Sequence, residues 1–304
     1  MKISPQADDR DFMLLAPSSA VDSSLLSPVE IARVLSAIPS APAVLVKLAS
    51  LPRDGSASLS EIGRLVKLDV GLACRVFRAA FESATEDEVP CFTLEDAINK
   101  LGSGYIHDLV KQVNRSQALN RPLESYGMEM DEFWRWSVST ALAAEVLAQS
   151  TGEDADVAFS LGLLHNAGIF AVEEWVRQES PGLAFAHRGW PREYTSAEVT
   201  FLGFTHAEVG AVLLNLWQFP RATTEPIRHQ YVPLRFGPHA RLTCLLHAAK
   251  WLAAAVCSED GMPPLPDARY LDVLRLPSYE LVKLVVEVRV RIGHARQAVC
   301  TLAA

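Results

Sequence analysis

The stretch Phe159-Ser-Leu-Gly-Leu-Leu-His-Asn-Ala-Gly168 gives the most direct indication of how the whole chain is built. Its side chains are apolar on nearly every side before Asn166, and the helical pattern continues to Arg177. A helix that is apolar all round is buried in the interior of a protein. We therefore expect one long helix over residues 159–177, in the middle of a helix bundle.

Helical patterns extend from this stretch in both directions. Ser58-Leu-Ser-Glu61 has the spacing of a capping box, and Thr93 to Asp96 is a weaker version with a shorter acid. The helix behind Thr93 is expected to break at Gly102 and Gly104. Apolar residues at helical spacing predict further helices over residues 134–149, 208–218 and 278–304.

Strands are not expected, because no segment alternates convincingly between apolar and polar residues. Residues 1–27 are rich in Ser, Asp and Pro and lack a sustained period, which is typical of a flexible N-terminal tail. From Pro28 onward the pattern is helical nearly everywhere. The expected fold class is all-α, a multi-helix bundle of roughly a dozen helices.

The composition excludes several classes of protein. Of the 304 residues, 49% are hydrophobic, and the net charge is −8, which argues against direct nucleic-acid binding because phosphates require clustered Lys and Arg. No secretory signal is evident, and no run approaches the roughly 20 apolar residues of a membrane helix. The five cysteines lack CxxC spacing and are expected to be reduced thiols rather than disulfides or zinc ligands. We expect a cytoplasmic protein that does not bind membranes.

Four segments of the chain occur together in a recognisable order and spacing. They are Ile38–Ala49 with Leu65–Asp69 and Leu72–Phe77, Thr93–Gly102, Phe159–Gly168, and His206–Trp217 followed by Phe219-Pro220. Together they resemble the HDOD family, a degenerate and non-catalytic relative of the HD metal-dependent phosphohydrolases. The resemblance runs from about residue 31 to about residue 255.

This resemblance implies a domain organisation. An HDOD module would occupy residues 28–255, with a smaller helical lobe over 28–130 and an HD-like lobe over 131–255 that share one core. Residues 256–304 would form a C-terminal helical extension.

The resemblance also shows where a metal site would lie. In the HD superfamily a His, a His-Asp pair and a later Asp hold a divalent cation, which polarises a phosphoryl oxygen and activates a water. The corresponding positions here are Trp136, His165-Asn166 and Lys250. An indole has no lone pair for a metal, Asn brings no negative charge, and an ammonium repels a cation. We therefore expect no metal, no other cofactor and no metal-dependent enzyme activity.

The expected remnant of the HD pocket consists of Trp136, His165, Asn166, His206, His229 and Lys250. The family often has a His-His pair before a proline, but Gln230 and Tyr231 stand there, and His229 lies one residue early. This departure weakens any transfer of pocket function.

Several of these residues have two interpretations. His165 is either a surviving metal ligand or, as we favour, a buried histidine with hydrogen-bond partners. The ammonium of Lys250 either replaces the metal, held by Asn166 and other acceptors, or is exposed on a polar helix face. His206 either lines the pocket or supports a helix start, and Trp136 is a core aromatic or a stacking surface for a nucleobase.

The resemblance implies a bacterial signalling protein that binds other signalling proteins without catalysis, in cyclic-di-GMP or two-component regulation. One alternative is a phosphohydrolase or phosphodiesterase with a site rebuilt from His165, His206 and His229. Another is a module that binds a small nucleotide in the emptied pocket. No G-x-S-x-G frame, Walker-type loop or dinucleotide fingerprint supports a different enzyme class.

Overall fold

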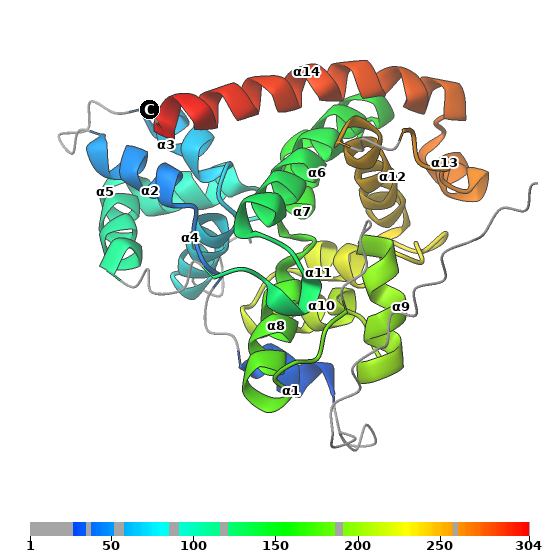
Figure 1. The fold of residues 1–304 in the computed structure, drawn as a ribbon. Coiled ribbons are helices and arrows are strands. Elements are labelled where there is room, and N and C mark those ends of the chain that lie inside the picture. The colour runs from blue at the N-terminus through cyan, green and yellow to red at the C-terminus, as the bar shows by residue number, and fades with distance from the viewer. Residues whose placement is uncertain are drawn as a thin grey trace, which may run out of the picture.

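The computed structural model describes residues 27–34, 38–51, 58–84, 91–115, 121–185, 191–257 and 261–303. Over these ranges the chain is built of α-helices and one short 3-10 helix, without strands, which confirms the all-α fold (Figure 1). The elements are α1 (Pro28–Arg33), α2 (Pro42–Ser50), α3 (Leu59–Val66), α4 (Val70–Glu82), α5 (Leu94–Arg115), η1 (Glu124–Tyr126), α6 (Met130–Thr151), α7 (Ala155–Leu164), α8 (Ala167–Glu179), α9 (Pro191–Leu202), α10 (His206–Leu216), α11 (Arg221–Arg228), α12 (Ala240–Cys257), α13 (Ala268–Leu274) and α14 (Ser278–Ala303). Nearly all of the expected N-terminal tail lies outside the described residues.

The first lobe consists of α2 to α5. Its helix starts are capped as the sequence predicts, since Ser58 Oγ accepts from the Glu61 amide at 3.1 Å. Thr93 and Asp96 form the reciprocal pair, with N–O distances of 3.0 and 3.3 Å. Gly102 has a φ of 77° and a ψ of 165°, outside the helical range, so α5 consists of two helical segments that meet there. The predicted break therefore occurs at Gly102, while Gly104 lies within the second segment.

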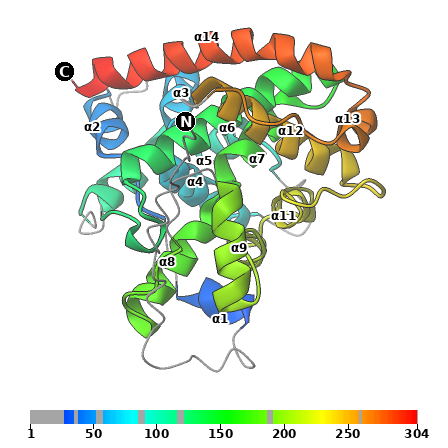
Figure 2. The ribbon, with the colours of Figure 1, turned by 45° about the vertical axis from the view of Figure 1, so that its right-hand side comes forward.

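The first helix does not belong to this lobe. α1 packs against α10 and α8, and both ribbon views show it on the far side of the molecule from α2 (Figures 1 and 2). α1, which the expected first lobe over residues 28–130 includes, therefore packs with the helices of the second lobe. A sequence period identifies an amphipathic helix but not the surface that the helix covers.

The second lobe is assembled around α6, α7, α8, α10 and α12. The single helix expected over residues 159–177 is two helices, α7 and α8, separated at His165 and Asn166. The His165 ring bonds to the Gly162 carbonyl, and Asn166 has φ −100° and ψ 10° as the N-cap of α8. Asn has a low preference for the helix interior and is favoured at the N-cap, and the non-helical backbone of Asn166 separates the two helices, although its side chain makes no cap hydrogen bond here.

Two glycines allow these helices to pack backbone against backbone. A Cβ on Gly162 would lie 2.7 Å from the Cα of Ala141 in α6. A Cβ on Gly168 would lie 1.9 Å from the carbonyl oxygen of His206, at the start of α10. Both glycines belong to the stretch from which the fold was inferred, and both are required by close approach.

The C-terminal region is packed onto the rest of the chain. α14 lies along α6, α12 and α2, at the outer edge of the molecule in both views (Figures 1 and 2). Two helical segments, Ala155–Glu179 and Ala240–Cys257, are long and apolar enough to cross a membrane, but 83% and 78% of their most apolar windows are buried inside the protein. Their apolar surface is used for internal packing.

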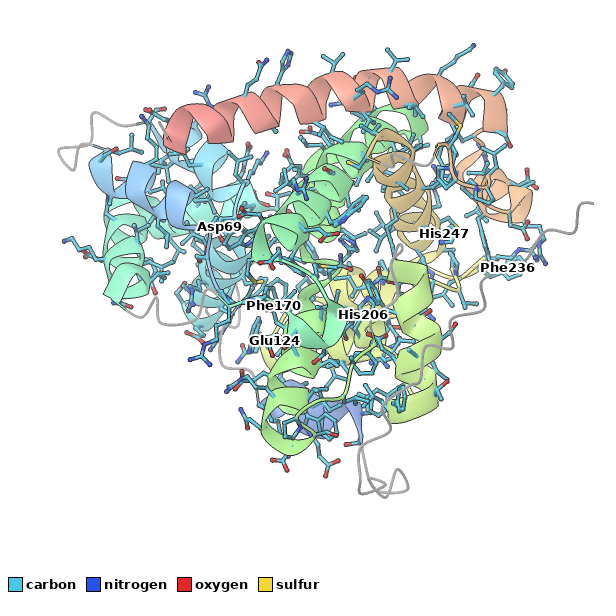
Figure 3. The ribbon with its side chains drawn as sticks, viewed as in Figure 1. Asp69, Glu124, Phe170, His206, Phe236 and His247 are labelled. Carbon is cyan, nitrogen blue, oxygen red and sulfur yellow. The ribbon has the colours of Figure 1, made fainter. Side chains whose placement is uncertain are left out.

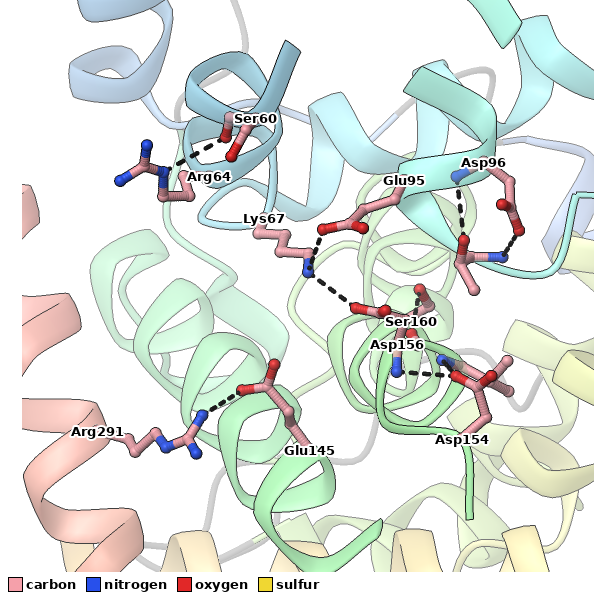
Figure 4. A network of polar contacts seen from close by, with 12 residues as sticks. Ser60, Arg64, Lys67, Glu95, Asp96, Glu145, Asp154, Asp156, Ser160 and Arg291 are labelled. Carbon is pink, nitrogen blue, oxygen red and sulfur yellow. Dashed lines mark hydrogen bonds and ion pairs between the residues drawn. The ribbon is translucent and has the colours of Figure 1, made fainter. Parts of the chain in front are cut away.

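Ion pairs connect the lobes and fasten α14 (Figure 4). Lys67, after α3, lies 3.0 Å from Asp156 of α7 and 3.3 Å from Glu95 of α5. Burial alone would lower the pKa of Lys67, but the two carboxylates outweigh it and raise that pKa. Arg291 of α14 bonds to Glu145 of α6 at 3.1 Å.

A buried carboxyl group starts α4 in the first lobe. Asp69 is fully buried and accepts from the amides of Leu72 at 2.9 Å and Ala41 at 2.7 Å. Desolvation raises its pKa to about 7, although both amides act to lower it.

This raised pKa predicts how stability depends on pH. Between pH about 4 and about 7 the folded state keeps a proton that the unfolded state has released, so stability falls as pH rises through this window. Asp69→Asn cannot titrate. We expect the stability of the wild type, relative to this variant, to fall by up to roughly 3 kcal/mol between pH 5 and pH 8. Urea unfolding of both proteins at three pH values measures the difference, and parallel pH profiles would contradict the assignment.

Candidate functional site

A set of polar groups, joined by hydrogen bonds and by one cation–π contact, runs through the interior of the second lobe. We call it the buried polar network, and it consists of Tyr126, His165, Glu198, His206, Gln230, Tyr231 and Lys250. Six of the seven are fully or nearly fully buried, and Tyr231 is partly exposed. The residues come from η1, α9, α10, α12, the end of α7 and the segment after α11, so only the folded chain brings them together.

Glu198 is the acceptor at one end of the network. α9 and α10 meet at an angle of 76°, and the carboxylate of Glu198 reaches across this bend. It accepts from the backbone amide of His206 at 2.9 Å, from His206 Nδ1 at 2.8 Å and from the Tyr126 hydroxyl at 2.6 Å. Burial would raise the pKa of Glu198, but the charge and hydrogen bonds of His206, together with Tyr126, outweigh it and lower that pKa.

His206 is held at both ring nitrogens. With Nδ1–H donating to Glu198, Nε2 is free to accept from the Tyr231 hydroxyl, 3.0 Å away. With this arrangement each of the three groups has a hydrogen-bond partner. Figure 3 shows His206 in the interior of the molecule, and its ring is fully buried. His206 is also the first residue of α10, as its second interpretation expects.

Lys250 closes the other end of the network. It is 7% exposed, its Nζ donates to Gln230 Oε1 at 2.7 Å, and the same Nζ lies 3.5 Å from the centroid of the Tyr231 ring. A desolvated ammonium over an aromatic face is stabilised by about 2 kcal/mol. The ammonium therefore donates to Gln230 and is not on an exposed helix face.

Gln230 fixes the position of Lys250. Its side-chain Nε2 donates to the backbone carbonyl of His165 at 2.8 Å, and its backbone carbonyl lies 3.0 Å from His247 Nδ1. Figure 3 shows His247 on the same side of the molecule as His206. Gln230 thus joins the α7–α8 junction to α12.

His165 is a neutral, buried histidine. It is 1% exposed, and its Nδ1 lies 2.6 Å from the Gly162 carbonyl. Desolvation, and then the charge of Lys250, hold its pKa well below the usual range. A ring that cannot charge at neutral pH and whose Nδ1 bonds to its own helix is a structural member of the network.

The structure distributes the six expected pocket residues unevenly. His165, His206 and Lys250 belong to the network, and Asn166 adjoins it at 2% exposure. The half-buried Trp136 packs against the second hydrophobic cluster, formed by α6, α12, α13 and α14. The His229 side chain is 33% exposed, and its Nε2 lies 3.7 Å from Glu225 of α11, the helix that ends beside it.

Sequence reasoning missed Glu198 and Tyr126, and it treated Gln230 and Tyr231 only as departures from a pattern. Glu198 had no local signal, because its role depends on the bend between α9 and α10. Gln230 and Tyr231 could have been identified from one signal. A polar pair stands at the expected His-His position, and a lysine stands at the expected Asp position.

The side chains at this site do not suit a divalent cation. Among the described residues no three His, Cys, Asp or Glu side chains gather closely enough to hold a metal. A dication requires anionic oxygen or neutral imidazole ligands, and here an ammonium stands among them. Glu198, the only carboxylate of the network, is committed to Tyr126 and His206.

Comparison with known sequences identifies one family. The HDOD domain model matches residues 38–233, more than half of the chain. A protein of Treponema pallidum (strain Nichols), described only as uncharacterized, is 26% identical over 201 residues, which are 64% of this chain and 38% of the relative. The chain therefore spans well under half of that relative's length.

Two solved structures share the fold. The response regulator MmoQ from Methylococcus capsulatus str. Bath has a TM-score of 0.67 at 20% identity, over 83% of this chain and 99% of that one. A virulence factor from Campylobacter jejuni subsp. jejuni has a TM-score of 0.63 at 16% identity, over 88% and 100% of the two chains.

Proposed function

The chain belongs to the HDOD family, and on this basis we propose that it is a regulatory protein that binds other signalling proteins and catalyses no metal-dependent hydrolysis. The observation that carries this proposal is the buried ammonium of Lys250, at the position where the parent superfamily has an Asp ligand. The ammonium is fixed by Gln230 and by the Tyr231 ring.

The energetic argument concerns the cost of placing a dication beside this ammonium. Two like unit charges about 4 Å apart repel each other by about 4 kcal/mol in a protein environment. A dication carries twice the charge, so its repulsion from the ammonium is about twice that value. His165 adds one imidazole, whose Nδ1 already bonds to a carbonyl. One neutral ligand does not offset the repulsion.

We expect the purified protein to retain no stoichiometric Mn, Fe, Zn or Ni after dialysis and to hydrolyse neither phosphate monoesters nor diesters. His165→Ala should lower the free energy of unfolding by about 1–3 kcal/mol, because it removes a buried side chain with its hydrogen bond. We expect it to change no activity. Elemental analysis, a chromogenic diester assay and urea unfolding measure the three quantities.

A bound metal at one equivalent together with turnover that His165→Ala abolishes would reverse the proposal. The exposed His294→Ala, on α14, is the matched control for stability and should change it by less than about 0.5 kcal/mol.

For the partners, we propose signalling proteins of two-component or cyclic-di-GMP pathways. In support, a protein of the same fold, MmoQ, is described as a response regulator. The module also matches only part of a longer relative, as expected of a domain that works beside others.

A surface suited to such a partner directly follows the network. Val232 and Phe236 are 73% and 82% exposed, and Figure 3 shows Phe236 at the periphery of the molecule. Exposed aromatic residues commonly anchor protein interfaces. Because Gln230 and Tyr231 begin the same segment, a partner bound there would contact residues next to the network. Affinity capture from the native organism identifies the partner.

A further inference from the structure

The loop between α11 and α12 exposes apolar side chains (Figure 3). Val232 and Phe236 are 73% and 82% exposed, more than any other large hydrophobic side chain of the described residues. The backbone between them is held in place, because Pro233 is buried and the Leu234 carbonyl accepts from Cys244 Sγ of α12 at 3.4 Å. An anchored loop thus presents apolar surface to water, and a group that covers it is favoured by the hydrophobic effect.

A second exposed loop lies beside the first. Met262 and Leu265 are 55% and 50% exposed. Hydrogen bonds from Arg269 lower the pKa of Asp267 to about 2, and the charge of Arg235 contributes to this shift. Because Arg235 acts on Asp267, the two loops are close together. The exposed loop surface, as we call it, consists of Val232, Arg235, Phe236, Met262 and Leu265.

The first loop lies in a stretch of the chain without negative charge. Residues 226–258 contain no Asp or Glu, although the protein has 36 of them and a net charge of −8. Arg235 is exposed, and its Cζ lies 5.6 Å from the centroid of the Phe236 ring. No ion pair joins Arg235 to a carboxylate of the described residues. A group that suits this surface therefore combines apolar side chains with negative charge.

The chain carries this combination near its N-terminus, in a segment outside the described residues. Residues 8–15 read Asp-Asp-Arg-Asp-Phe-Met-Leu-Leu, with three carboxylates, one Arg and four apolar side chains in succession. The carboxylates complement the charge of Arg235, and the apolar side chains complement Val232 and Phe236.

The connection to the folded part of the chain is long enough for such a contact. Phe12 precedes Ser27, the first described residue, by 15 positions (27 − 12). An extended chain of that length spans up to about 50 Å, whereas a folded domain of this size has a radius of gyration of about 19 Å. The starting point is also favourable, because α1 packs against α10, α10 packs against α11, and the first loop follows α11.

We propose that residues 8–15 cover the exposed loop surface and compete with partner proteins for it. This inference rests on the proposed function, since it concerns the regulation of the surface assigned there to a partner. Attachment to the same chain gives an effective concentration of the order of millimolar, so a dissociation constant of about 1 mM suffices to cover the surface for about half of the time. A partner has to displace the segment, which lowers the apparent affinity of that partner.

Photocross-linking in the full chain tests this contact. The photoreactive amino acid p-benzoylphenylalanine in place of Phe236 keeps an aromatic ring on the surface. On irradiation of the dilute protein it should form an adduct with residues 8–15 of the same chain, which mass spectrometry of the digested monomer identifies. The same amino acid in place of Val286, which is 68% exposed on α14, is the matched control, and its adduct with residues 8–15 should be at least about tenfold weaker.

Charge variants of the segment test the electrostatic part of the contact. With the photoreactive group at position 236, the combined variant Asp8→Asn, Asp9→Asn and Asp11→Asn should lower the adduct yield at least about threefold. Asp22→Asn, which removes an acid outside residues 8–15, is the control and should leave the yield unchanged.

Charge reversal on the surface tests the other side of the contact. Arg235→Glu replaces attraction by repulsion and should lower the yield by about the same factor or more. Arg289→Glu, on the exposed face of α14, is the control and should leave the yield unchanged. Both side chains are exposed, so neither variant should shift the thermal unfolding midpoint.

The proposal is overturned if position 236 forms adducts only between chains or with other molecules, or if positions 236 and 286 link to residues 8–15 equally. It is also overturned if the yield responds to neither set of charge variants. These outcomes leave the proposed function intact, because a partner can bind an uncovered surface. Metal-dependent turnover, by contrast, would reverse the proposed function and leave the cross-link to residues 8–15 unchanged.

Discussion

Gly168→Ala is expected to cost about 3 kcal/mol or more of folding stability, or to prevent folding. The added Cβ would stand 1.9 Å from the His206 carbonyl oxygen and 2.5 Å from the Gly210 amide nitrogen. Both are backbone atoms, so no side chain can move aside, and α8 and α10 must separate. Since a domain is stable by only about 5–15 kcal/mol, this single methyl removes a large share of the total.

Two further glycines allow the stability loss expected of Gly168→Ala to be compared with that of other Gly→Ala variants. Gly162→Ala brings its Cβ to 2.7 Å from the Ala141 Cα and should cost less than Gly168→Ala. Gly104→Ala meets nothing within 4 Å and lies in a helix, so it should be neutral or stabilise the protein by up to about 1 kcal/mol. Urea unfolding gives the three values, and equal losses at Gly168 and Gly104 would contradict the backbone contact.

Features of the fold that depend on residues close together in the sequence could be predicted from the sequence. The caps at Ser58 and Thr93 form as expected, because a cap joins residues three positions apart. The all-round apolar character of residues 159–164 identifies a central helix, and α7 is buried. The break after α7 was missed because apolar periodicity passes through His165 and Asn166, whereas the non-helical backbone of Asn166 separates the two helices.

The candidate site is predictable only in part. His165, His206 and Lys250 were identified because a family pattern marks their positions, although they lie 41 and 44 residues apart (206 − 165 and 250 − 206). The pattern does not contain Glu198, whose role follows from the 76° bend between α9 and α10. His229 was included because its residue type fits, yet its ring lies beside Glu225.

The physical reason is that each network bond joins elements whose relative placement is a tertiary property. Gln230 reaches the His165 carbonyl across 65 positions of the sequence, and Tyr126 reaches Glu198 across 72. No helical or strand period relates such residues. The residue type at a family position therefore identified Lys250, whereas its hydrogen-bond acceptor, Gln230, is known only from the fold.

Glu198→Gln is expected to cost about 3 kcal/mol or more, and Glu198→Ala at least as much. The carboxylate receives three donors: the Tyr126 hydroxyl, the His206 amide and His206 Nδ1. An amide offers one acceptor oxygen and places an NH2 group against the remaining donors, which leaves buried donors unpaired. Glu82→Gln is the matched control, because Glu82 forms an exposed pair with Arg78 that is worth less than about 1 kcal/mol.

The pH dependence of the stability of the wild type and of Glu198→Gln tests the same hydrogen bonds independently. Because the folded pKa of Glu198 is lowered, the unfolded state takes up the proton first, so its contribution is present above pH about 4.5 and is lost as pH falls below it. The stability difference between the wild type and Glu198→Gln should therefore shrink from pH 7 to pH 3.5, while the difference for Glu82→Gln stays small throughout. A Glu198→Gln protein as stable as the wild type at pH 7 would mean that the carboxylate does not hold His206.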